Sequence, residues 1–596
     1  MKVGSMSTRK TIPINDTIDH KVQSPSPPKG RRGKPMARRI ALLQVNPTVG
    51  DIKGNSEMIS AMAELAMSAG AVLAISTECA LSGYPPRDLL LQPDFITACA
   101  EEAAAMECVI PILVGTPVLP LEERTKPGNG VVRAGKDGRE LVRKQLLPTY
   151  DVFDEARYFE ADERPGISRT TGGLDIGVTI CEDAWQHARE TPTDYDSDPI
   201  SQIVEWGRQG VNLDATVNLS ASPYHADKAE VRLAVARAAA ESLGHPFLLA
   251  NQVGGNDDLL FDGRSIIAWP DGSALLAPGW REGVLIADLD DIDSCEWIGD
   301  GKTIKLGSGE SPNIGDDDVL EAVVMGLSDY CRKSGIEKIV LGLSGGIDSA
   351  LAACVAAAAV GPANVTGISM PSRHSSQHSI DDAIATAEAL GIEFMMKPIS
   401  NLHDSAEISL SDILESGNPV AAENLQARLR GLIVMAQANA TGAMAIATGN
   451  KSELGQGYCT LYGDMAGGYA PLGDLYKMEV YAMARAFNER LGFEAVTEST
   501  MTKPPSAELA PDQKDEDSLP PYPLLDEILR LHIEGGLDAT GICSHGHDPT
   551  IVNEVLTRLA RNEHKRWQMP PAPRVSCRAF GQGWRQPLAA RHDWRH

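Results

Sequence analysis

The sequence has few features of a membrane protein or of a disulfide-stabilised one. Its longest alanine-rich apolar run, residues 351 to 360, is about half the length that a transmembrane helix needs. The ten cysteines are scattered and include no C-x-x-C pair, which is typical of a reducing compartment. No apolar stretch near the N-terminus resembles a signal peptide. We therefore expect a cytoplasmic protein with no membrane partner.

Positive charge is also scarce. The chain has 54 Lys and Arg against 81 Asp and Glu, which gives a formal net charge of −27. Contacts with phosphate backbones need local positive charge, so this composition argues against a nucleic-acid partner. A small phosphorylated substrate in a local basic pocket is still compatible with it. The hydrophobic content of 43% and the charged content of 23% are otherwise those of a soluble globular protein.

The length of 596 residues exceeds one ordinary core and predicts two to four domains of roughly 150 residues each. Residues 1–36 are rich in Ser, Pro, Lys and Arg, and we predict a disordered tail there. Short apolar strands alternate with helices over 37–290, as in an α/β layered domain. The polar, acidic and Gly-rich residues 291–317 predict a linker, and a second α/β domain follows over 318–596.

Two segments of the second domain carry more specific predictions. Residues 424 to 440 form a helical pattern that places apolar side chains on one face, which we expect to pack on the sheet. That face consists of Leu425, Leu429, Leu432, Ile433 and Ala436. The polar, Pro-rich residues 504 to 523 are too long for a simple turn and predict a lid.

A glycine-rich loop stands between a buried strand and a helix in the second domain. It reads GLSGGIDS and comprises Gly342, Leu343, Ser344, Gly345, Gly346, Ile347, Asp348 and Ser349. Backbone N–H groups of such a loop, at a helix N-terminus, form a site for an anion. The chain has no G-x-x-x-x-G-K-[ST], so this is not the usual nucleoside-triphosphate loop. Asp348 indicates that a cation or an amine is bound beside the phosphate.

Two other interpretations of this loop stay open. It is compatible with an ordinary tight turn from strand to helix. The spacing Gly342-x-Ser344-x-Gly346 also matches the nucleophile elbow of α/β-hydrolases, which would make Ser344 a nucleophile. The additional Gly345 and the acidic Asp348 are not required by an elbow, and they favour a phosphate site.

The loop resembles the SGG-x-DS pyrophosphate loop of the ATP pyrophosphatases. Further segments are similar to one member, the NAD synthetase family: MPSRHSSQHSIDDA (370–383), ENLQARLR (423–430), ATGNKSELGQGYCTLYGDMAGGYAPLGDLYK (447–477), KPPSAELAPDQKDEDSLPPY (503–522) and NEHKRWQMPPAPRVSCRAFG (562–581). The resemblance implies that ATP binds the loop 342–349 and Thr448. It implies deamido-NAD contacts at Asn424, Glu453 and Lys565, and Mg²⁺ held by Asp348 and Glu453.

Three residues of the first domain supply the parts of a cysteine nucleophile site. Glu78 ends a strand in STECALSGYPPRDLL, Lys144 lies in RKQLLPTYDVFDEARYF, and Cys181 follows the strand LDIGVTI. A thiolate attacks a carbonyl when a base takes its proton and an ammonium stabilises the oxyanion. Spacing alone, however, favours an ordinary buried core cysteine at position 181.

These segments resemble the nitrilase superfamily, and specifically the glutaminase domain of glutamine-dependent NAD synthetases, over roughly 37–290. The resemblance implies a four-layer αββα sandwich. It also implies that Glu78 is the general base, Lys144 the oxyanion stabiliser, and Cys181 the nucleophile that forms a thioester. Its glutamine-holding positions correspond to Tyr150, Ser222 and Lys228.

The expected fold is thus a nitrilase-like αββα sandwich followed by a doubly wound parallel-sheet domain of the adenine nucleotide alpha hydrolase type. The resemblance implies a carbon–nitrogen ligase that uses ATP, deamido-NAD and glutamine, with Mg²⁺, and that forms a homo-oligomer. Two alternatives are an ATP pyrophosphatase that modifies a tRNA base and an ammonia-dependent synthetase with a scaffold domain. The net charge argues against the first, and the complete Glu–Lys–Cys set against the second. A C-x-H-x-H sequence at Cys543, His545 and His547 has zinc-like spacing but no evident fourth ligand.

Overall fold

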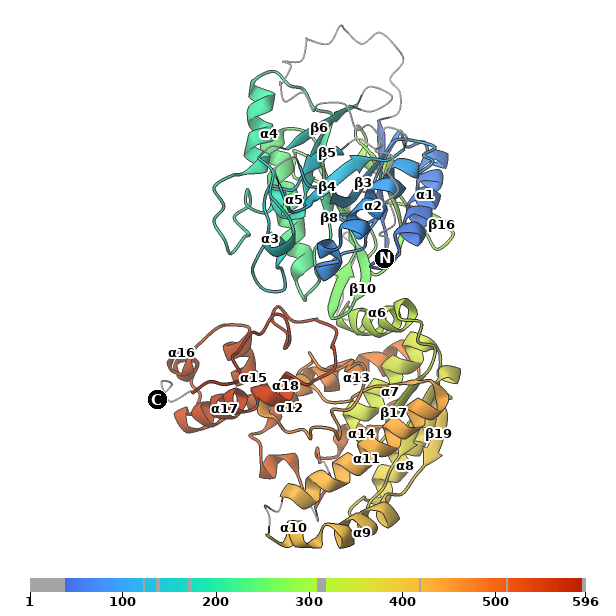
Figure 1. The fold of residues 1–596 in the computed structure, drawn as a ribbon, viewed down its shortest axis with the longest axis vertical. Helices are drawn as coiled ribbons and strands as arrows, with labels where there is room; N and C mark the ends of the chain where they lie inside the picture. The colour runs from blue at the N-terminus through green and yellow to red at the C-terminus, as the bar shows by residue number, and fades with distance from the viewer. Residues whose placement is uncertain are drawn as a thin grey trace, which may run out of the picture.

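The computed structural model describes residues 38–591, apart from 122–123, 136–139, 164, 170–173, 308–317, 417, 419, 507 and 511–512. The tail predicted over 1–36 therefore lies outside the described residues. Two α/β bodies meet where β10 lies beside α6 (Figure 1). None of the helices within the described ranges is long and apolar enough to cross a bilayer.

The first body contains two facing sheets. The larger sheet is formed, in spatial order, by β16 (Lys302–Lys305), β15 (Glu296–Gly299), β14 (Gly283–Asp288), β1 (Arg39–Gln44), β2 (Leu73–Ile75), β3 (Ile112–Val118), β4 (Gly128–Arg133) and β5 (Glu140–Arg143). The smaller is formed by β13 (Ala274–Leu276), β12 (Ile266–Ala268), β9 (Phe247–Asn251), β8 (Ala215–Ser220), β7 (Asp175–Ile180) and β6 (Gly166–Arg169).

Helices cover the outer face of each sheet. The larger sheet packs against α1 (Ile52–Ser68) and α2 (Pro93–Ala105), and the smaller against α4 (Pro199–Arg208) and α5 (Lys228–Leu243). The remaining elements are η1 (Arg87–Leu91), α3 (Glu155–Tyr158), η2 (Cys181–Ala184), η3 (Ile292–Ser294) and the hairpin of β10 (Val253–Asn256) and β11 (Leu259–Asp262).

The alternation of side chains along each strand produces these layers. In β1, Ile40 and Leu42 belong to the core between the sheets, whereas Ala41 and Leu43 pack beneath α1 and α2. Because both faces are covered, such strands read as nearly continuous apolar runs. The predicted αββα sandwich is confirmed.

The predicted linker over 291–317 is wrong for its first half, because residues 296–305 form β15 and β16 at the edge of the larger sheet. Trp297 of β15 is only 2% exposed and joins the core between the sheets. The polar sequence arises because β16 is a solvent-exposed edge strand and because Asp300 and Gly301 form the hairpin turn with positive φ. Residues 308–317 of the predicted linker lie outside the described residues.

The second body is built on four parallel strands in the order β19 (Glu393–Met396), β18 (Val365–Ser369), β17 (Ile339–Gly342) and β20 (Met444–Ala445). One face packs against α6 (Asp318–Lys333), α7 (Ile347–Val360), α8 (Gln377–Leu390) and α13 (Lys477–Leu491). The other packs against α11 (Val420–Thr441), which in turn contacts α9 (Ser400–Ser409). The remaining elements are η4 (Pro362–Asn364), α10 (Ser411–Ser416), α12 (Lys451–Gln456), α14 (Glu498–Thr502), η5 (Asp515–Asp517), α15 (Tyr522–Ile533), α16 (Ala539–Ser544), α17 (Pro549–Arg561) and α18 (Glu563–Arg566).

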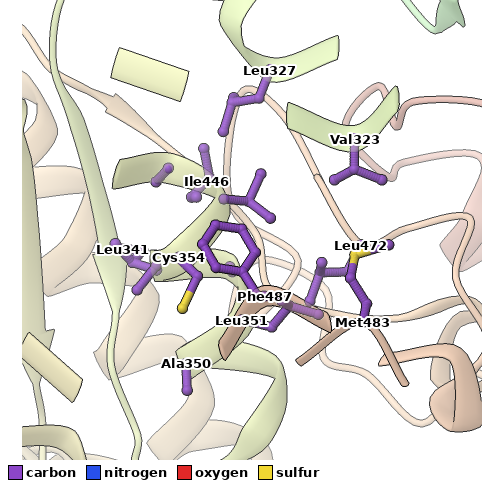
Figure 2. Packing of buried hydrophobic residues seen from close by; sticks show 14 of the residues in the cluster. Val323, Leu327, Leu341, Ala350, Leu351, Cys354, Ile446, Leu472, Met483 and Phe487 are labelled. Carbon is purple, nitrogen blue, oxygen red and sulfur yellow. The ribbon is translucent and has the colours of Figure 1, made fainter. Parts of the chain in front are cut away.

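This sheet is buried on both faces. Leu341 of β17 points into the core with α6, α7 and α13, whereas Val340 points to the core beneath α11. Figure 2 shows Phe487 of α13 among side chains from α6, β17 and α7. Helices on both faces of a parallel sheet are the predicted doubly wound arrangement, which is confirmed.

The face by which α11 packs differs from the prediction. Leu432, which we expected to lie on the sheet, is 58% exposed, and Ala436 is exposed as well. Val434 and Ala438 are buried instead, in the core shared with β17 and β20. The prediction assumed that the larger apolar residues of this helix pack on the sheet, but Leu432 lies on the outer surface.

Helix α6 belongs to the second body but is bonded to the first at both ends. At its start, Asp318 accepts hydrogen bonds from Arg264 and from Trp280 Nε1. Near its end, Asp329 accepts a hydrogen bond from Asn46 Nδ2 at 2.8 Å, and Lys333 Nζ donates to the Gly255 carbonyl at 2.8 Å.

Candidate active sites

The buried cluster of the first body is assembled where strands end. Glu78 follows β2 and Lys144 follows β5, and both side chains are fully buried. Lys144 Nζ lies 2.7 Å from Glu78 Oε1, and Asn129 Nδ2 donates to the same oxygen at 2.7 Å. The Ala221 amide donates to Glu78 Oε2 at 3.1 Å. Hydrogen bonds to both oxygens thus fix the orientation of the Glu78 carboxylate.

A second carboxylate holds the same lysine. Lys144 Nζ donates to Glu155 Oε1 at 2.8 Å, and Tyr84 Oη donates to that oxygen at 2.8 Å. Burial would by itself lower the pKa of Lys144, but the charges of Glu155 and Glu78 raise it well above its ordinary value. Burial raises the pKa of Glu155 to about 7. The sequence analysis missed Glu155, which is one of several acids in DVFDEARYF with no distinguishing local signal.

Cys181 lies at the sharp turn from β7 into η2, with φ of 42° and 5% exposure. A non-glycine residue in this left-handed region is strained and is held by its surroundings. Burial and the charge of Glu78 raise the pKa of the Cys181 thiol well above its ordinary value, while Lys144 acts in the opposite direction. The resting thiol is therefore neutral and needs a base before it can attack.

Asp183 is a further buried residue that the sequence analysis did not single out. Its carboxylate accepts hydrogen bonds from the backbone amides of Ile180, Gln145 and Leu146 at 2.9 to 3.0 Å. Burial raises its pKa to about 7. These bonds join the turn that carries Cys181 to the chain directly after Lys144, so Asp183 fixes nucleophile and ammonium relative to each other.

The three predicted glutamine-holding residues lie around this cluster. Tyr150 Oη donates to both oxygens of Glu182, at 2.9 and 3.1 Å. Lys228, at the start of α5, has its Nζ 4.1 Å from the centre of the Trp185 ring, and burial lowers its pKa to about 8. Ser222 is buried, and its amide donates to Asn251 Oδ1. Tyr150 and Lys228 are half-buried, so they mark the outer side of the cluster.

The predicted phosphate loop borders a cavity of about 420 Å³ in the second body. The predicted residues that line it are Gly342, Leu343, Ser344, Gly346, Ile347, Asp348, Ser349, Thr448 and Glu453. Gly345 is buried behind the loop with φ of +80°, and a Cβ there would lie 2.0 Å from the Ser379 carbonyl oxygen. Only glycine fits this turn, because α8 packs directly against it.

Ser344 has the contacts of a loop residue. Its Oγ lies 3.0 Å from Ser349 Oγ and accepts from the Gly346 amide at 3.2 Å. Among the described residues, no histidine hydrogen-bonds to Ser344. A nucleophile elbow needs such a base, so the geometry favours the phosphate-loop interpretation.

Two carboxylates in this cavity share one cation. Lys477 Nζ contacts Asp348 Oδ2 and lies 3.3 Å from Glu453 Oε1, and Asn450 Nδ2 donates to Asp348 Oδ1 at 2.8 Å. Burial, and then the charge of Asp348, raise the pKa of Glu453 to about 8. Paired carboxylate oxygens are the ligands that Mg²⁺ prefers, so Asp348 and Glu453 fit that ion.

The other predicted deamido-NAD contacts lie beside the cavity rather than on its wall. Lys565 Nζ donates to the carbonyls of Gly457 and Cys459, both at 2.7 Å. Asn424 Oδ1 accepts from Thr460 Oγ1 at 2.8 Å. Cys459 lines the cavity, so Lys565 stabilises the cavity wall indirectly, by holding the turn after α12.

The cavity also has basic residues that the sequence analysis did not single out, namely Lys477, Arg430 and Lys503. They supply local positive charge within a chain of net charge −27. The lid predicted over 504–523 contributes Pro504, Pro505, Ser506, Glu508, Leu509 and Asp515 to the wall. Glu508 accepts a hydrogen bond from Ser379 Oγ at 2.7 Å, which holds this segment beside the phosphate loop.

Comparisons with known proteins cover both bodies. The carbon-nitrogen hydrolase family model matches residues 39–297, and the NAD synthase family model matches residues 319–570. The glutamine-dependent NAD(+) synthetase of Synechocystis sp. is 42% identical over 92% of this chain and 98% of its own length. The enzyme of that name from Thermotoga maritima is 37% identical over 93% of this chain and 98% of its own length.

Solved structures give the same result. The glutamine-dependent NAD+ synthetase of Acinetobacter baumannii, in complex with ADP, matches with a TM-score of 0.69 and 32% identity over 92% of this chain and 98% of that one. The fold also matches a glutamine-dependent NAD(+) synthetase of Cytophaga hutchinsonii, with a TM-score of 0.73 and 22% identity over 93% and 98% of the two chains. With both bodies matched along nearly their whole length, the chain belongs to the family of glutamine-dependent NAD(+) synthetases.

Proposed function

We propose that this protein makes NAD from deamido-NAD, with glutamine as the nitrogen donor and ATP as the energy source. The products are NAD, AMP, pyrophosphate and glutamate. One observation carries the proposal: a lysine clamped by two buried carboxylates beside a buried cysteine stands in the same chain as a phosphate-loop cavity. Each arrangement supplies one half of an amide transfer.

At the first site, Glu78 takes the proton of Cys181 as the thiol attacks the side-chain amide of glutamine. Lys144 keeps its positive charge because two carboxylates face it, and that charge stabilises the oxyanion. Ammonia leaves with the proton that Glu78 returns, and a thioester remains on Cys181. Water then hydrolyses the thioester to glutamate, with Glu78 again acting as the base.

At the second site, ATP lies along the loop 342–349 and Thr448, with Lys477, Arg430 and Lys503 near its phosphates. The nicotinate carboxylate of deamido-NAD, held near Asn424, Glu453 and Lys565, attacks the α-phosphate and releases pyrophosphate. Mg²⁺ held by Asp348 and Glu453 supplies charge neutralisation for the triphosphate when bound. Ammonia then displaces AMP from the acyl-adenylate. Since ammonia must arrive uncharged, a passage through the protein from Cys181 protects it from protonation.

The proposal includes a homo-oligomer. Large apolar side chains are exposed on the neighbouring helices α9, α10 and α11: Ile408 is 78% exposed, Ile413 58%, and Leu432 58%. Large apolar side chains exposed on neighbouring helices are typical of an interface. A second copy of this chain is the occupant that the family resemblance implies, and light scattering of the purified protein gives the mass that tests it.

The test of the activity uses the full chain with ATP, Mg²⁺, deamido-NAD and glutamine labelled with ¹⁵N in its side-chain amide. We expect labelled NAD and an equal amount of AMP. Formation of NAD only when ammonium salts are added would contradict the glutaminase half. Formation of ADP in place of AMP would contradict the adenylation half.

A further inference from the structure

One cluster of metal-ligating side chains lies outside both candidate active sites. On α9, the imidazole of His403 and the carboxylates of Asp404 and Glu407 each place one ligand atom within 4.8 Å of the other two. This helix lies at the opposite end of the second body from the first body (Figure 1). Within the described residues, no other group of three or more His, Cys, Asp or Glu side chains gathers in this way, and the C-x-H-x-H sequence at 543–547 does not.

The imidazole of His403 has an unused ligand atom. The residue is 3% exposed, and among the described residues its Nε2 has no hydrogen-bond partner. This nitrogen faces the cluster, since Glu407 Oε1 lies 3.5 Å from it. A zinc ion with bonds of about 2.0–2.2 Å to nitrogen and oxygen holds its tetrahedral ligand atoms about 3.3–3.6 Å apart. The two atoms therefore already have the spacing of two ligands of one ion.

Helical spacing produces this arrangement. His403 and Glu407 are four residues apart, so their side chains lie on the same side of α9. The side chain of Asp404 is 65% exposed and that of Glu407 is 36% exposed, so both carboxylates are free to rotate. With water at the remaining position, the imidazole and the two carboxylates make up the four ligands of a tetrahedral site.

Arg373 now binds the same three side chains. Its Nη2 donates to His403 Nδ1 at 2.9 Å and to Glu407 Oε2 at 2.5 Å, and it lies 3.8 Å from Asp404 Oδ1. A guanidinium only donates, so Nδ1 carries the lone pair and the neutral ring holds its proton on Nε2. A metal ion on Nε2 requires that proton on Nδ1 instead. Arg373 and a metal ion are therefore mutually exclusive partners of His403.

Displacing this arginine is inexpensive. The side chain of Arg373 is 49% exposed, so water replaces its bonds at a small cost in free energy. Arg373 belongs to the segment after β18, in which Pro371 and Ser375 line the phosphate-loop cavity. The side chains of the cluster lie outside the wall of that cavity. An ion bound on α9 is therefore separate from the phosphates of ATP.

We propose that His403, Asp404 and Glu407 bind a divalent transition-metal ion of the zinc type, and that Arg373 competes with that ion. Imidazole and carboxylate ligands together suit Zn²⁺, Co²⁺ and Ni²⁺, whereas Mg²⁺ prefers a shell of oxygen atoms. This ion is distinct from the Mg²⁺ of the triphosphate, and its site is independent of the proposed function.

The experiment measures Zn²⁺ binding to the metal-stripped, full-length protein by equilibrium dialysis. Excess Mg²⁺ is present, so that Asp348 and Glu453 are occupied. We expect Glu407→Gln and His403→Gln each to weaken Zn²⁺ binding by at least about 10- to 100-fold. Arg373→Gln should tighten it by about 3- to 10-fold, because the competitor and its positive charge are removed.

His545→Gln is the matched control, because His545 is an exposed histidine of the second body outside the cluster. Its Zn²⁺ binding should equal that of wild type. Equal binding by wild type and Glu407→Gln would overturn the inference, since the ion would then be held elsewhere. Binding by Arg373→Gln that is no tighter than that of wild type would overturn the competition. Misfolding does not produce tighter binding, so this variant tests the cluster even if His403→Gln fails to fold.

Co²⁺ serves as a second probe because its absorption reports its ligands. In wild type we expect weak visible bands from nitrogen and oxygen ligands, and we expect Glu407→Gln to lose them. Wild type should show no strong near-ultraviolet band of a cobalt–thiolate bond. Such a band, retained in Glu407→Gln, would place the ion on a cysteine such as the exposed Cys577 and would overturn the inference.

Discussion

Two buried lysines of the first body have opposite electrostatic settings. Lys144 faces two carboxylates, which raise its pKa well above the ordinary value despite burial. Lys228 has no such partner at bonding distance among the described residues, and burial, followed by the charge of Arg232, lowers its pKa to about 8. Lys144 therefore stays charged throughout the neutral range, whereas Lys228 titrates at its upper edge.

The first prediction concerns the pH dependence of glutamine binding. As the pH rises through about 8, Lys228 loses its proton and with it the charge that attracts the α-carboxylate. We expect the KM for glutamine to rise by up to about tenfold per pH unit above that value. Lys228→Arg should remove this rise, because guanidinium stays protonated. Initial rates between about pH 7 and about pH 9 provide the measurement.

The ammonium of free glutamine also titrates in alkali, and it does so equally in both proteins. The difference between wild type and Lys228→Arg therefore isolates the contribution of the enzyme. Parallel KM profiles for the two would exclude Lys228 as the group that titrates.

The second prediction concerns Lys565. Its ammonium holds the carbonyls of Gly457 and Cys459, and Cys459 lines the cavity. Lys565→Ala should weaken the use of deamido-NAD by about 10- to 100-fold, the scale of one charge-assisted contact. Glutamine hydrolysis, which occurs in the other body, serves as the control. An unchanged KM for deamido-NAD would exclude the residue from the site.

At the scale of single residues, sequence motifs identified the side chains assigned to the reactions but not the side chains that position them. The segments around Glu78, Lys144 and Cys181 are distinctive in themselves. Lys477 is not, because it bonds Asp348 across 129 positions of sequence. Asp183 likewise ties its turn to residues 37 and 38 positions earlier. Contacts made only in the folded chain leave no local pattern in a single sequence.

Among the elements, the phosphate loop is the one most restricted by its neighbour. Gly345 combines a positive φ with a Ser379 carbonyl oxygen 2.0 Å from where a Cβ would lie. Gly361, which follows α7, has a similar φ of +83° but no atom within 4 Å. Alanine substitutions at these two positions therefore distinguish the effect of backbone strain from that of a steric clash.

The third prediction uses this pair. Gly345→Ala should displace the loop or α8 and abolish ATP-dependent pyrophosphate exchange, while glutamine hydrolysis persists. Gly361→Ala should cost only the strain of its backbone at φ of 83° and ψ of 143°, on the order of 1–3 kcal/mol, and should keep exchange activity. Melting temperatures and exchange rates of both variants give the comparison. Normal exchange by Gly345→Ala would show that the loop is not packed as described.

Elements that are buried on both faces were predicted correctly from the sequence, whereas elements at the surface were not. The strands β1 and β17 were predicted because apolar residues fill both of their faces. The edge strand β16 is exposed throughout and reads as polar linker. The orientation of α11 was wrong because small residues such as Ala438, rather than Leu432, pack against the sheet. On such a helix, the size of an apolar side chain does not predict whether it is buried.

At the scale of the molecule, the two chemistries are assigned to different bodies, and the fourth prediction tests that division. Cys181→Ala should make no NAD from glutamine. It should still make NAD from ATP, deamido-NAD and abundant ammonium at alkaline pH, where the reactive NH₃ fraction is larger. Cys295→Ala is the matched control, because Cys295 is also buried in the first body but lies beside Asp288 rather than Lys144.

Retention of glutamine-dependent activity by Cys181→Ala would make Cys181 an ordinary core cysteine. Loss of both activities in a folded variant would show that the two bodies are not separable as assigned. The assay product is NAD in each case, measured against the same protein concentration.

The attachment of α6 to the first body at both ends bears on how the protein unfolds. Lys333 is 8% exposed at its side chain and bonds carbonyls of the other body, so detaching the bodies would break these bonds and expose the surface buried between them. We therefore expect the two halves to unfold as one cooperative unit, so that calorimetry records a single thermal transition rather than two. Asp329→Ala, which removes the acceptor of Asn46, should split that transition. A protein whose two chemistries can be inactivated separately would then unfold as one, so a substitution that unfolds either half would unfold the other with it.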